Sequence, residues 1–256
     1  VDGPYEVEHL SHSVQSMIST MRHLMEDVLR QEEEKRRSEL DVLQSQINPH
    51  FLYNTLDSVV WMTENGRTQE AVVMLTALAR FFRISLSKGS NIIPIGDEIE
   101  HARNYLTIQK MRYKDKLEFE IHVDPSIMNT HIVKLTLQPI VENAVRHGIR
   151  GMEENGTILL TVHGCRDSIR ISVRDNGKGM SRERILEVME GRKQETPDDG
   201  DSTGIGLDNV VSRLELYYQQ KGLVQIVSEG PGMGTEVIIH IPVKEEIGHV
   251  SDITGR

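Results

Sequence analysis

Two helix-periodic runs on either side of an Asn-Gly turn constrain the fold of this chain most. The first run reaches about Glu64, Asn65-Gly66 is a turn dipeptide, and the second run covers residues 70–86. The apolar positions of the second run are Val73, Leu75, Leu78, Phe81 and Phe82. This pattern predicts a helical hairpin. Because so thin a hairpin cannot bury both apolar faces alone, we expect two copies to pair as a four-helix bundle in a homodimer.

The N-terminal stretch has the spacing of a coiled coil. Its apolar residues follow one another at intervals of four, three, four, three and four: Leu10, Val14, Met17, Met21, Leu24 and Val28. These are a and d positions, which predict a seam with a partner chain; an amphipathic helix lying on its own domain is the alternative. A charged run at residues 30–39 then shifts the phase of the apolar positions, so the register slips there.

Composition excludes several classes of protein. The chain has 256 residues, enough for about one to two domains, and a formal net charge of −10, which argues against binding nucleic acid or anionic membranes. Its one cysteine, Cys165, excludes an internal disulfide and suits a reducing cytosol. The chain lacks both a signal peptide and an apolar run of about eighteen residues, so the sequence as given reads as soluble. It begins with Val rather than Met, so we expect a piece of a longer protein.

Alternating helix and strand patterns follow the hairpin. Helices are predicted at residues 97–111, 134–147 and 206–219, and strands at residues 117–123, 157–163, 169–174, 224–228 and 235–243. A Gly-rich and charged stretch covers residues 176–203, and residues 244–256 have the composition of a loose tail. The fold class is therefore helical in its first part and α/β in its second, with helices on one face of a sheet.

Three segments of the second half have the chemistry of a nucleotide site. In the helix QPIVENAVRHG, the side chains of Glu142, Asn143, Arg146 and His147 fall on neighbouring faces. The amide oxygen of Asn143 can ligate Mg²⁺, and Arg146 offers donors to phosphate.

The other two segments are rich in glycine. In DNGKGM, Asp175 ends a strand, while Gly177 and Gly179 permit a tight turn and a close approach of the backbone to a ligand. In TGIGLDNV, Gly204 and Gly206 begin a helix, whose free N–H groups favour phosphate.

A Pro-His pair interrupts the first helix of the hairpin, in LQSQINPHFLYN. Pro49 has no N–H to give to the carbonyl of Ser45, and its ring pushes Asn48 out of α geometry, so the helix should kink just before His50. This geometry leaves the imidazole of His50 on an accessible turn. A buried or merely solvated histidine beside a kink is the alternative.

In their order and separation, the three segments resemble the ATP-binding fold shared by DNA gyrase, heat-shock chaperones, sensor histidine kinases and mismatch-repair ATPases. The resemblance covers about residues 97–243. It implies that Asn143 holds Mg²⁺, that Asp175 accepts a hydrogen bond from the adenine amino group, and that the stretch at residues 180–203 is a mobile lid. It also implies a pocket around ATP formed by Gly177, Gly179, Gly204 and Gly206, with Thr235 near the base and Leu207 at the phosphate end.

Hydrolases and kinases of this fold differ at one position. The hydrolysing branch places a Glu four residues before the metal-binding Asn, where this chain has Pro139, which can neither take nor give a proton. A separate nucleophile should therefore receive the phosphoryl group. The segment QINPHFLYN closely resembles the phosphoacceptor motif of LytS/YesM-like sensor histidine kinases, which implies that His50 is that nucleophile.

Two neighbours of His50 invite further assignments. The residue after His50 is Phe51, whereas the larger histidine-kinase groups have an acidic residue at that position. The role of this acidic residue is therefore vacant here, or it is taken by another residue such as Glu142. Asn54 lies one turn after His50, where related kinases position water for dephosphorylation; a surface hydrogen-bonding Asn is the alternative.

The resemblance also implies the organisation of the chain. We expect the end of a HAMP-like relay and coiled coil at residues 1–36, a dimerisation and histidine-phosphotransfer hairpin at 37–90, an ATP-binding catalytic domain at 91–245 and a tail at 246–256. The implied partners are a second copy and the receiver domain of a response regulator, and the implied location is the cytoplasmic side of a membrane sensor. An ATP-driven dimer clamp without phosphotransfer and a degenerate, purely binding protein are the alternatives.

Overall fold

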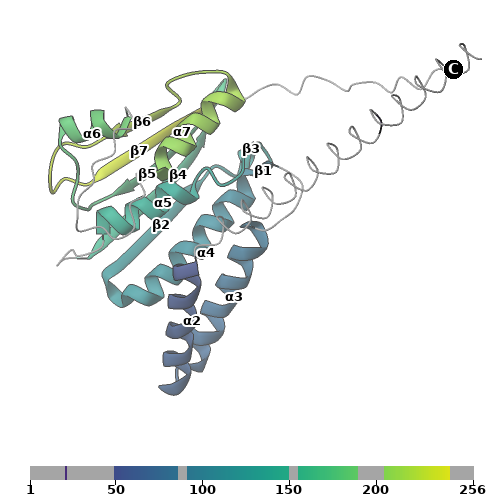
Figure 1. Cartoon of the computed structure of the whole chain (residues 1–256), viewed down its shortest axis with the longest axis vertical. Coiled ribbons are helices and arrows are strands. Elements are labelled where there is room, and N and C mark those ends of the chain that lie inside the picture. The colour runs from purple at the N-terminus through teal and green to yellow at the C-terminus, as the bar shows by residue number, and fades with distance from the viewer. Residues whose placement is uncertain (1–20, 22–48, 86–90, 150–154, 190–204, 243–256) are drawn as a thin grey trace, which may run out of the picture. The chain divides into compact units, whose positions relative to one another are not determined.

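The computed structural model describes residues 21, 49–85, 91–149, 155–189 and 205–242 (Figure 1). The chain divides into two compact units, residues 1–53 and residues 54–256. The predicted coiled-coil seam, apart from Met21, lies outside the described residues. So do the kink before Pro49, the charged run, Gly204 and the C-terminal tail.

The predicted hairpin consists of helix α2 (Pro49–Glu64) and helix α3 (Thr68–Ser85). Its turn is the Asn-Gly dipeptide: Gly66 has a φ of +72°, a left-handed conformation that glycine adopts without a steric penalty. The amide of Gly66 donates to the carbonyl of Thr63, and the amide of Arg67 donates to that of Met62 at 2.8 Å. These two bonds form a Schellman motif, so the sequence ends α2 by satisfying its last carbonyls.

The hairpin has two apolar faces. One is buried within the chain and includes Met62 on α2 and Ala71, Met74, Leu78 and Phe81 on α3. The other remains exposed and consists of Leu56 and Val60 on α2 with Val72, Val73 and Leu75 on α3. Leu78 and Phe81 of the predicted apolar run are thus buried, whereas Val73 and Leu75 are exposed. The hairpin leaves one apolar stripe without cover from the described residues of this chain.

The second half contains, within the described residues, a five-stranded sheet of order β2-β4-β5-β7-β6 (Figure 1). Its strands are β2 (Leu117–Val123), β4 (Gly156–Gly164), β5 (Ser168–Asp175), β6 (Val224–Val227) and β7 (Thr235–Pro242). Strands β2 and β4 pair in parallel and all the other neighbours are antiparallel. All five strands fall where the alternating pattern predicts them, within one or two residues.

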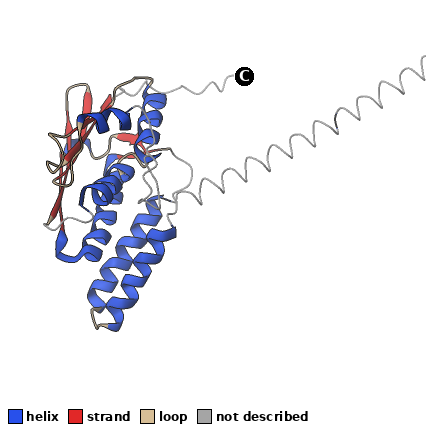
Figure 2. Cartoon of the chain, turned by 60° about the vertical axis from the view of Figure 1, so that its left-hand side comes forward, coloured by secondary structure: helices blue, strands red, loops and turns tan. Residues whose placement is uncertain are grey.

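Helices cover one face of the sheet, as Figure 2 shows. They are α4 (Ile95–Tyr113), α5 (Gln138–Asn143) with the π-helical turn that follows it (Ala144–Ile149), and α7 (Ile205–Tyr218), which are labelled in Figure 1. Residues facing these helices are buried, and they alternate along each strand with more exposed ones. The buried apolar residues of the central strands include Ile158, Leu160 and Val162 on β4, Ile169, Ile171 and Val173 on β5, and Ile239 and Ile241 on β7. This face forms the core of the α/β part.

The structure corrects the start of the third predicted helix. Residues 134–137 are not helical, and α5 begins only at Gln138. Leu135 has a φ of +58°, a left-handed conformation that a right-handed helix excludes, and the Thr136 hydroxyl donates to the carbonyl of Val133. The preceding strand β3 (His131–Val133) pairs with β1 (Ile92–Pro94), and helix α6 (Arg182–Met189) occupies the Gly-rich stretch. None of these three elements was predicted.

Helix α3 is attached to α4 near its C-terminal end. The ring of His101 on α4 stacks on Phe81 at 4.3 Å between centroids, and its Nε2 lies 2.7 Å from the Ser85 hydroxyl. Lys134 Nζ donates to the Ser85 carbonyl at 2.9 Å. Since His101 is 1% exposed, burial lowers the pKa of its imidazole to about 4, with a further contribution from Lys134. His101 is therefore a neutral core residue at physiological pH.

This burial predicts a stability that depends on pH. Between pH 6.5 and about 4, the unfolded chain binds a proton at His101 and the folded chain does not, so stability falls as the pH falls through this window. The loss should approach roughly 3 kcal/mol. Urea unfolding of the wild type and of a His101→Phe variant across this range measures it, because the variant cannot titrate there. Parallel pH profiles for the two proteins would contradict the expectation.

A second contact joins the hairpin to the α/β part. Trp61 on α2, the single tryptophan of the chain, is 44% exposed. The ammonium group of Lys114 lies 5.2 Å from the centroid of its ring, and the guanidinium of Arg67 lies 5.5 Å from it. Lys114 directly follows α4, so this cation–π contact links α2 to the junction between α4 and β2.

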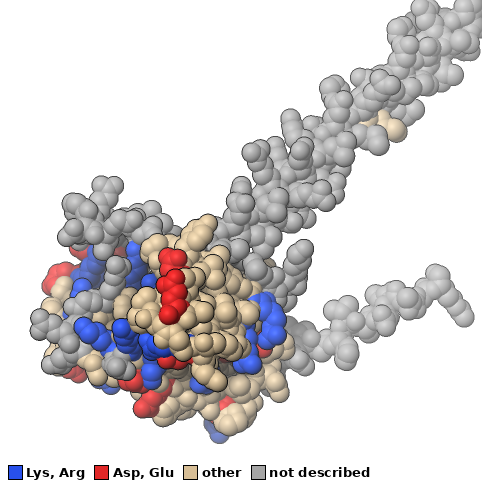
Figure 3. Space-filling view, turned by 90° about the horizontal axis from the view of Figure 1, so that it is seen from below, with Lys and Arg blue, Asp and Glu red and all other residues tan. Residues whose placement is uncertain are grey.

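Two general properties complete the description. None of the described helices combines the length and the apolar character needed to cross a membrane. On the face drawn in Figure 3, Lys and Arg side chains lie beside Asp and Glu side chains, so neither sign of charge covers that face.

Candidate nucleotide-binding and phosphoacceptor sites

Asp175 is a carboxylate on the apolar face of the sheet. It is the last residue of β5, two and four residues after the buried Val173 and Ile171, and it is 6% exposed. Its Oδ1 accepts the amide of Gly177 at 2.8 Å, and the amide of Thr235 also donates to the carboxyl group. Burial raises the pKa of Asp175, and these two amides oppose that effect. A buried carboxylate that accepts these two backbone amides still has lone pairs with which to accept a further donor from a ligand.

The turn after β5 is packed backbone to backbone against the π-helical turn. A Cβ on Gly177 would lie 2.1 Å from the carbonyl oxygen of Gly148, and the amide of Lys178 donates to that same carbonyl at 3.2 Å. A Cβ on Gly148 would lie 2.8 Å from Cγ of Asp175. Gly179 has a φ of +63° and lies against Gly230. Only glycine at these positions allows the carboxylate and the two turns to approach so closely.

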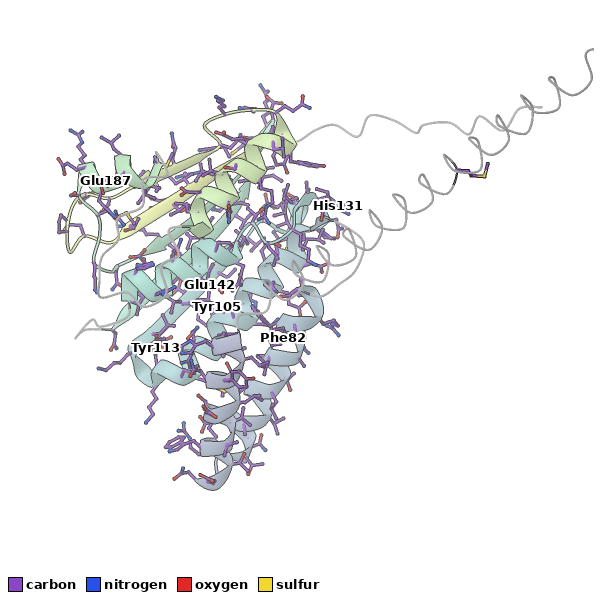
Figure 4. All side chains as sticks on the ribbon, in the orientation of Figure 1. Phe82, Tyr105, Tyr113, His131, Glu142 and Glu187 are labelled. Carbon is purple, nitrogen blue, oxygen red and sulfur yellow. The ribbon has the colours of Figure 1, made fainter. Side chains whose placement is uncertain are left out.

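The segment from α5 through the π-helical turn carries the polar cluster predicted from the sequence. The Glu142 carboxylate accepts a hydrogen bond from the side-chain amide of Gln138 at 2.7 Å. Glu142 lies near Tyr105 at the contact between α5 and α4, as Figure 4 shows. Burial raises the pKa of Glu142, while Gln138 and Arg146 oppose that effect. Asn143 is half-buried, Arg146 is half-buried and His147 is exposed. The π-helical turn at Arg146 and His147 is a rare conformation that is frequent at functional sites.

The remaining nucleotide residues lie on α7 and β7. Gly206 is in the first turn of α7, and Leu207 is 6% exposed. Thr235 is 8% exposed and is the register partner of Asp175 across β5 and β7. The fold thus brings Asp175, Gly177 and Thr235 together at one end of the sheet, with Gly148 beside them.

The donor set fits magnesium held together with a substrate. Among the described residues, no group of three or more His, Cys, Asp and Glu side chains could hold a metal ion. Mg²⁺ commonly uses one or two protein ligands together with substrate phosphates and waters. A half-buried amide such as that of Asn143 is a ligand of this kind.

The phosphoacceptor candidate lies on α2. His50 is exposed in the first turn of the described helix, in agreement with an accessible imidazole. Asn54 is half-exposed one turn later, and its carbonyl accepts the hydroxyl of Ser58 at 2.7 Å. The two side chains therefore lie on the same side of α2.

Sequence reasoning missed Gly148 and Glu98. Gly148 ends the quoted segment QPIVENAVRHG, but its contact with Asp175 depends on the π-helical turn, which no local pattern signals. Glu98 lies in the first turn of α4, is 0% exposed, and accepts the amides of Leu135, Thr136 and Leu137. From the sequence alone, an acidic residue among helix-forming neighbours is predicted to be exposed to solvent, so nothing local indicates that Glu98 is buried.

Two segments of the chain match known protein families. Residues 38–117 match the family described as Histidine kinase. Residues 129–245 match the family described as Histidine kinase-, DNA gyrase B-, and HSP90-like ATPase. The first match contains His50, and the second contains Asn143, Asp175 and Thr235.

Individual relatives are sensor kinases. The sensor histidine kinase YesM of Bacillus subtilis is 33% identical over 231 residues, which cover 90% of this chain and 38% of YesM. The sensor protein LytS of Staphylococcus haemolyticus is 29% identical over 214 residues, which cover 82% of this chain and 35% of LytS. Among solved structures, the Acinetobacter baumannii histidine kinase AdeS is 14% identical with a TM-score of 0.44, covering 82% of this chain and 98% of that one.

The chain thus spans little more than a third of the length of the curated relatives it matches. Within that span the helical hairpin with an exposed histidine comes first and the α/β domain second. The match to the Histidine kinase family likewise precedes the match to the ATPase family along the chain. This chain belongs to the LytS/YesM-like group of sensor histidine kinases.

Proposed function

We propose that the chain transfers the γ-phosphoryl group of Mg-ATP to His50 and then to an aspartate of a response regulator in a two-component system. The observation that carries this proposal is the exposed imidazole of His50 in the segment NPHFLYN, in a chain that also holds a buried carboxylate at the end of an ATPase-type sheet. The family of the chain supports the same activity.

The chemistry uses the imidazole as a nucleophile. The unprotonated nitrogen of a neutral His50 attacks the γ-phosphorus, and an N–P bond forms as the bond to the β–γ bridging oxygen breaks. ADP leaves with that electron pair, and the imidazole then loses the proton of its other nitrogen. Glu142 is our candidate to accept this proton, since burial raises the pKa of its carboxyl group toward that of a general base.

We assign the nucleotide roles by analogy with the family, and the position of Asp175 beside Gly177 and Thr235 supports them. Asp175 accepts the adenine amino group, Thr235 lies near the base, and Gly177, Gly179, Gly204 and Gly206 surround the nucleotide. Leu207 closes the phosphate end. Asn143 supplies the protein ligand of Mg²⁺, which would neutralise charge on the phosphates when bound, and Arg146 and His147 offer donors to them.

The residue at position 139, a proline, favours phosphoryl transfer to histidine over hydrolysis of ATP. Pro139 lies at the start of α5, where the hydrolysing branch of the fold carries its Glu. Proline offers no general base to activate water. Asn54 is our candidate to position water for dephosphorylation of the partner, with a purely surface role as the alternative.

Assembly and location complete the proposal. The exposed stripe of Leu56, Val60, Val72, Val73 and Leu75 supports pairing of two hairpins in a homodimeric four-helix bundle. We assign residues 37–90 to the dimerisation and phosphotransfer hairpin and residues 91–245 to the catalytic domain. Residues 1–36 would be the end of a HAMP-like relay and coiled coil. The chain would then be the cytoplasmic portion of a protein anchored in the cell membrane.

Incubation with γ-labelled ATP and Mg²⁺ tests this function. The expected product is a labelled protein whose phosphate is lost in acid and retained in alkali, as a phosphoramidate is, with the label on the peptide that contains His50. Sustained release of phosphate without a labelled protein would instead support the ATP-driven dimer clamp. Failure to bind ATP would support a purely binding protein.

A further inference from the structure

The N-terminal end of α5 is tied to α4 by a buried side chain. The carboxylate of Glu98 accepts three consecutive backbone amides, those of Leu135, Thr136 and Leu137, the last two at 3.1 Å. These amides directly precede α5, whose own N-terminal residue makes no capping bond from its side chain. Glu98 therefore anchors the backbone that leads into α5, although it lies 39 positions from Leu137 in the sequence.

A second element contacts the loop formed by residues 134–137, which contains these three amides. Arg213 on α7 donates through Nη2 to the carbonyl of Leu135 at 2.6 Å, and its positive charge also attracts the Glu98 carboxylate. Leu135 holds its left-handed conformation, which is unfavourable for a residue with a side chain, between these two groups. The loop thus fixes α4, α5 and α7 to one another at one point.

The far end of the α5 segment reaches the nucleotide site. Six residues of α5 and six of the π-helical turn run continuously from Gln138 to Ile149, with Asn143 in the middle and Gly148 against Asp175. A displacement at the Glu98 end therefore moves the Asn143 side chain, because the helical segment between them is short. Leu207 lies on α7, the helix that Arg213 holds.

We infer that Glu98 is a positioning residue for the metal end of the nucleotide site, and that it acts by holding the amides before α5 so that Asn143 keeps the orientation needed to ligate Mg²⁺. This inference rests on the proposed function. Glu98 contacts neither substrate nor metal, and its effect should therefore appear in the contribution of the metal to nucleotide binding.

Glu98→Gln is the principal test. Glutamine has nearly the same shape, but its amide group would face the N–H donors, so at least one of the three amides loses its acceptor. Titration of a non-hydrolysable ATP analogue, with Mg²⁺ and with EDTA, gives the gain in affinity that the metal provides. This gain should fall about tenfold in Glu98→Gln, since small misplacements of a coordinating group cost factors of ten or more.

Two further variants keep the test decisive. Asp97→Asn alters an exposed carboxylate one residue earlier on α4 and should leave the metal-dependent gain at the wild-type value. Glu98→Asp retains the charge with a shorter side chain and should recover part of the gain. If Glu98→Gln does not fold, Glu98→Asp carries the test: a reduced gain supports the inference, and an unchanged gain overturns it.

The outcomes separate the inference from the proposed function. If the wild type binds the analogue with a metal-dependent gain and Glu98→Gln keeps that gain, the inference is wrong, and so it is if both affinities fall by the same factor. If the wild type itself shows no gain from Mg²⁺, the assignment of Asn143 as a metal ligand fails instead.

Discussion

Replacing His50 with glutamine is expected to abolish phosphorylation of the chain while leaving ATP binding unchanged. Glutamine cannot form the N–P bond, and His50 lies on α2, outside the α/β part that contains Asp175 and Asn143. Incorporation of label from γ-labelled ATP should fall by at least about a thousandfold, because no second nucleophile takes over the role of a missing one. Calorimetric titration with an ATP analogue measures the binding that should remain.

A matched control exists on the same chain. His131 is exposed, as His50 is, but it lies on β3, and His131→Gln should retain wild-type labelling. Labelling of the His50→Gln protein at the wild-type rate would show that His50 is not the acceptor. A fall in both variants would indicate a general effect of losing an exposed imidazole.

Introducing a methyl group at Gly177 is expected to disrupt the nucleotide site. The new Cβ would lie 2.1 Å from the carbonyl oxygen of Gly148 and 2.3 Å from its carbon, and backbone atoms cannot rotate away as a side chain can. Either the turn after β5 or the π-helical turn must shift. We expect Gly177→Ala to lower the free energy of unfolding by about 2–4 kcal/mol and to weaken ATP binding by more than tenfold.

Gly222→Ala separates the steric effect from a general effect of losing a glycine. Gly222 has a φ of +73° and nothing within 4 Å of the added Cβ, so the substitution costs only the strain of a left-handed alanine, about 1–2 kcal/mol. Its ATP affinity should match that of the wild type. Wild-type ATP affinity in Gly177→Ala would show that the close approach of the two turns is not needed for binding.

The sequence predicts the elements that local patterns determine. The Asn65-Gly66 turn, both hairpin helices and all five strands of the main sheet agree with the structure, because periodicity and turn residues act over a few positions. Among the site residues, Asp175 and Gly177 lie together as their spacing after a strand predicts.

Other features depend on contacts between distant parts of the chain. Helix α5 starts four residues later than its pattern predicts, because Glu98 and Arg213 hold the preceding loop from α4 and α7. The proximity of Gly148 to Asp175 follows from the π-helical turn, and the pairing of β1 with β3 joins two three-residue strands. Such contacts leave no periodic signal in the sequence.

The placement of Trp61 gives the molecule an internal optical reporter. Indole emission responds to the polarity and charge around the ring, and here both the ammonium group of Lys114 and the guanidinium group of Arg67 lie over it. Lys114 belongs to the α/β part, whereas Trp61 and Arg67 belong to the hairpin region. Since no other tryptophan contributes to the spectrum, the intensity and wavelength of emission from the unmodified protein follow the contact between α2 and the end of α4 in real time.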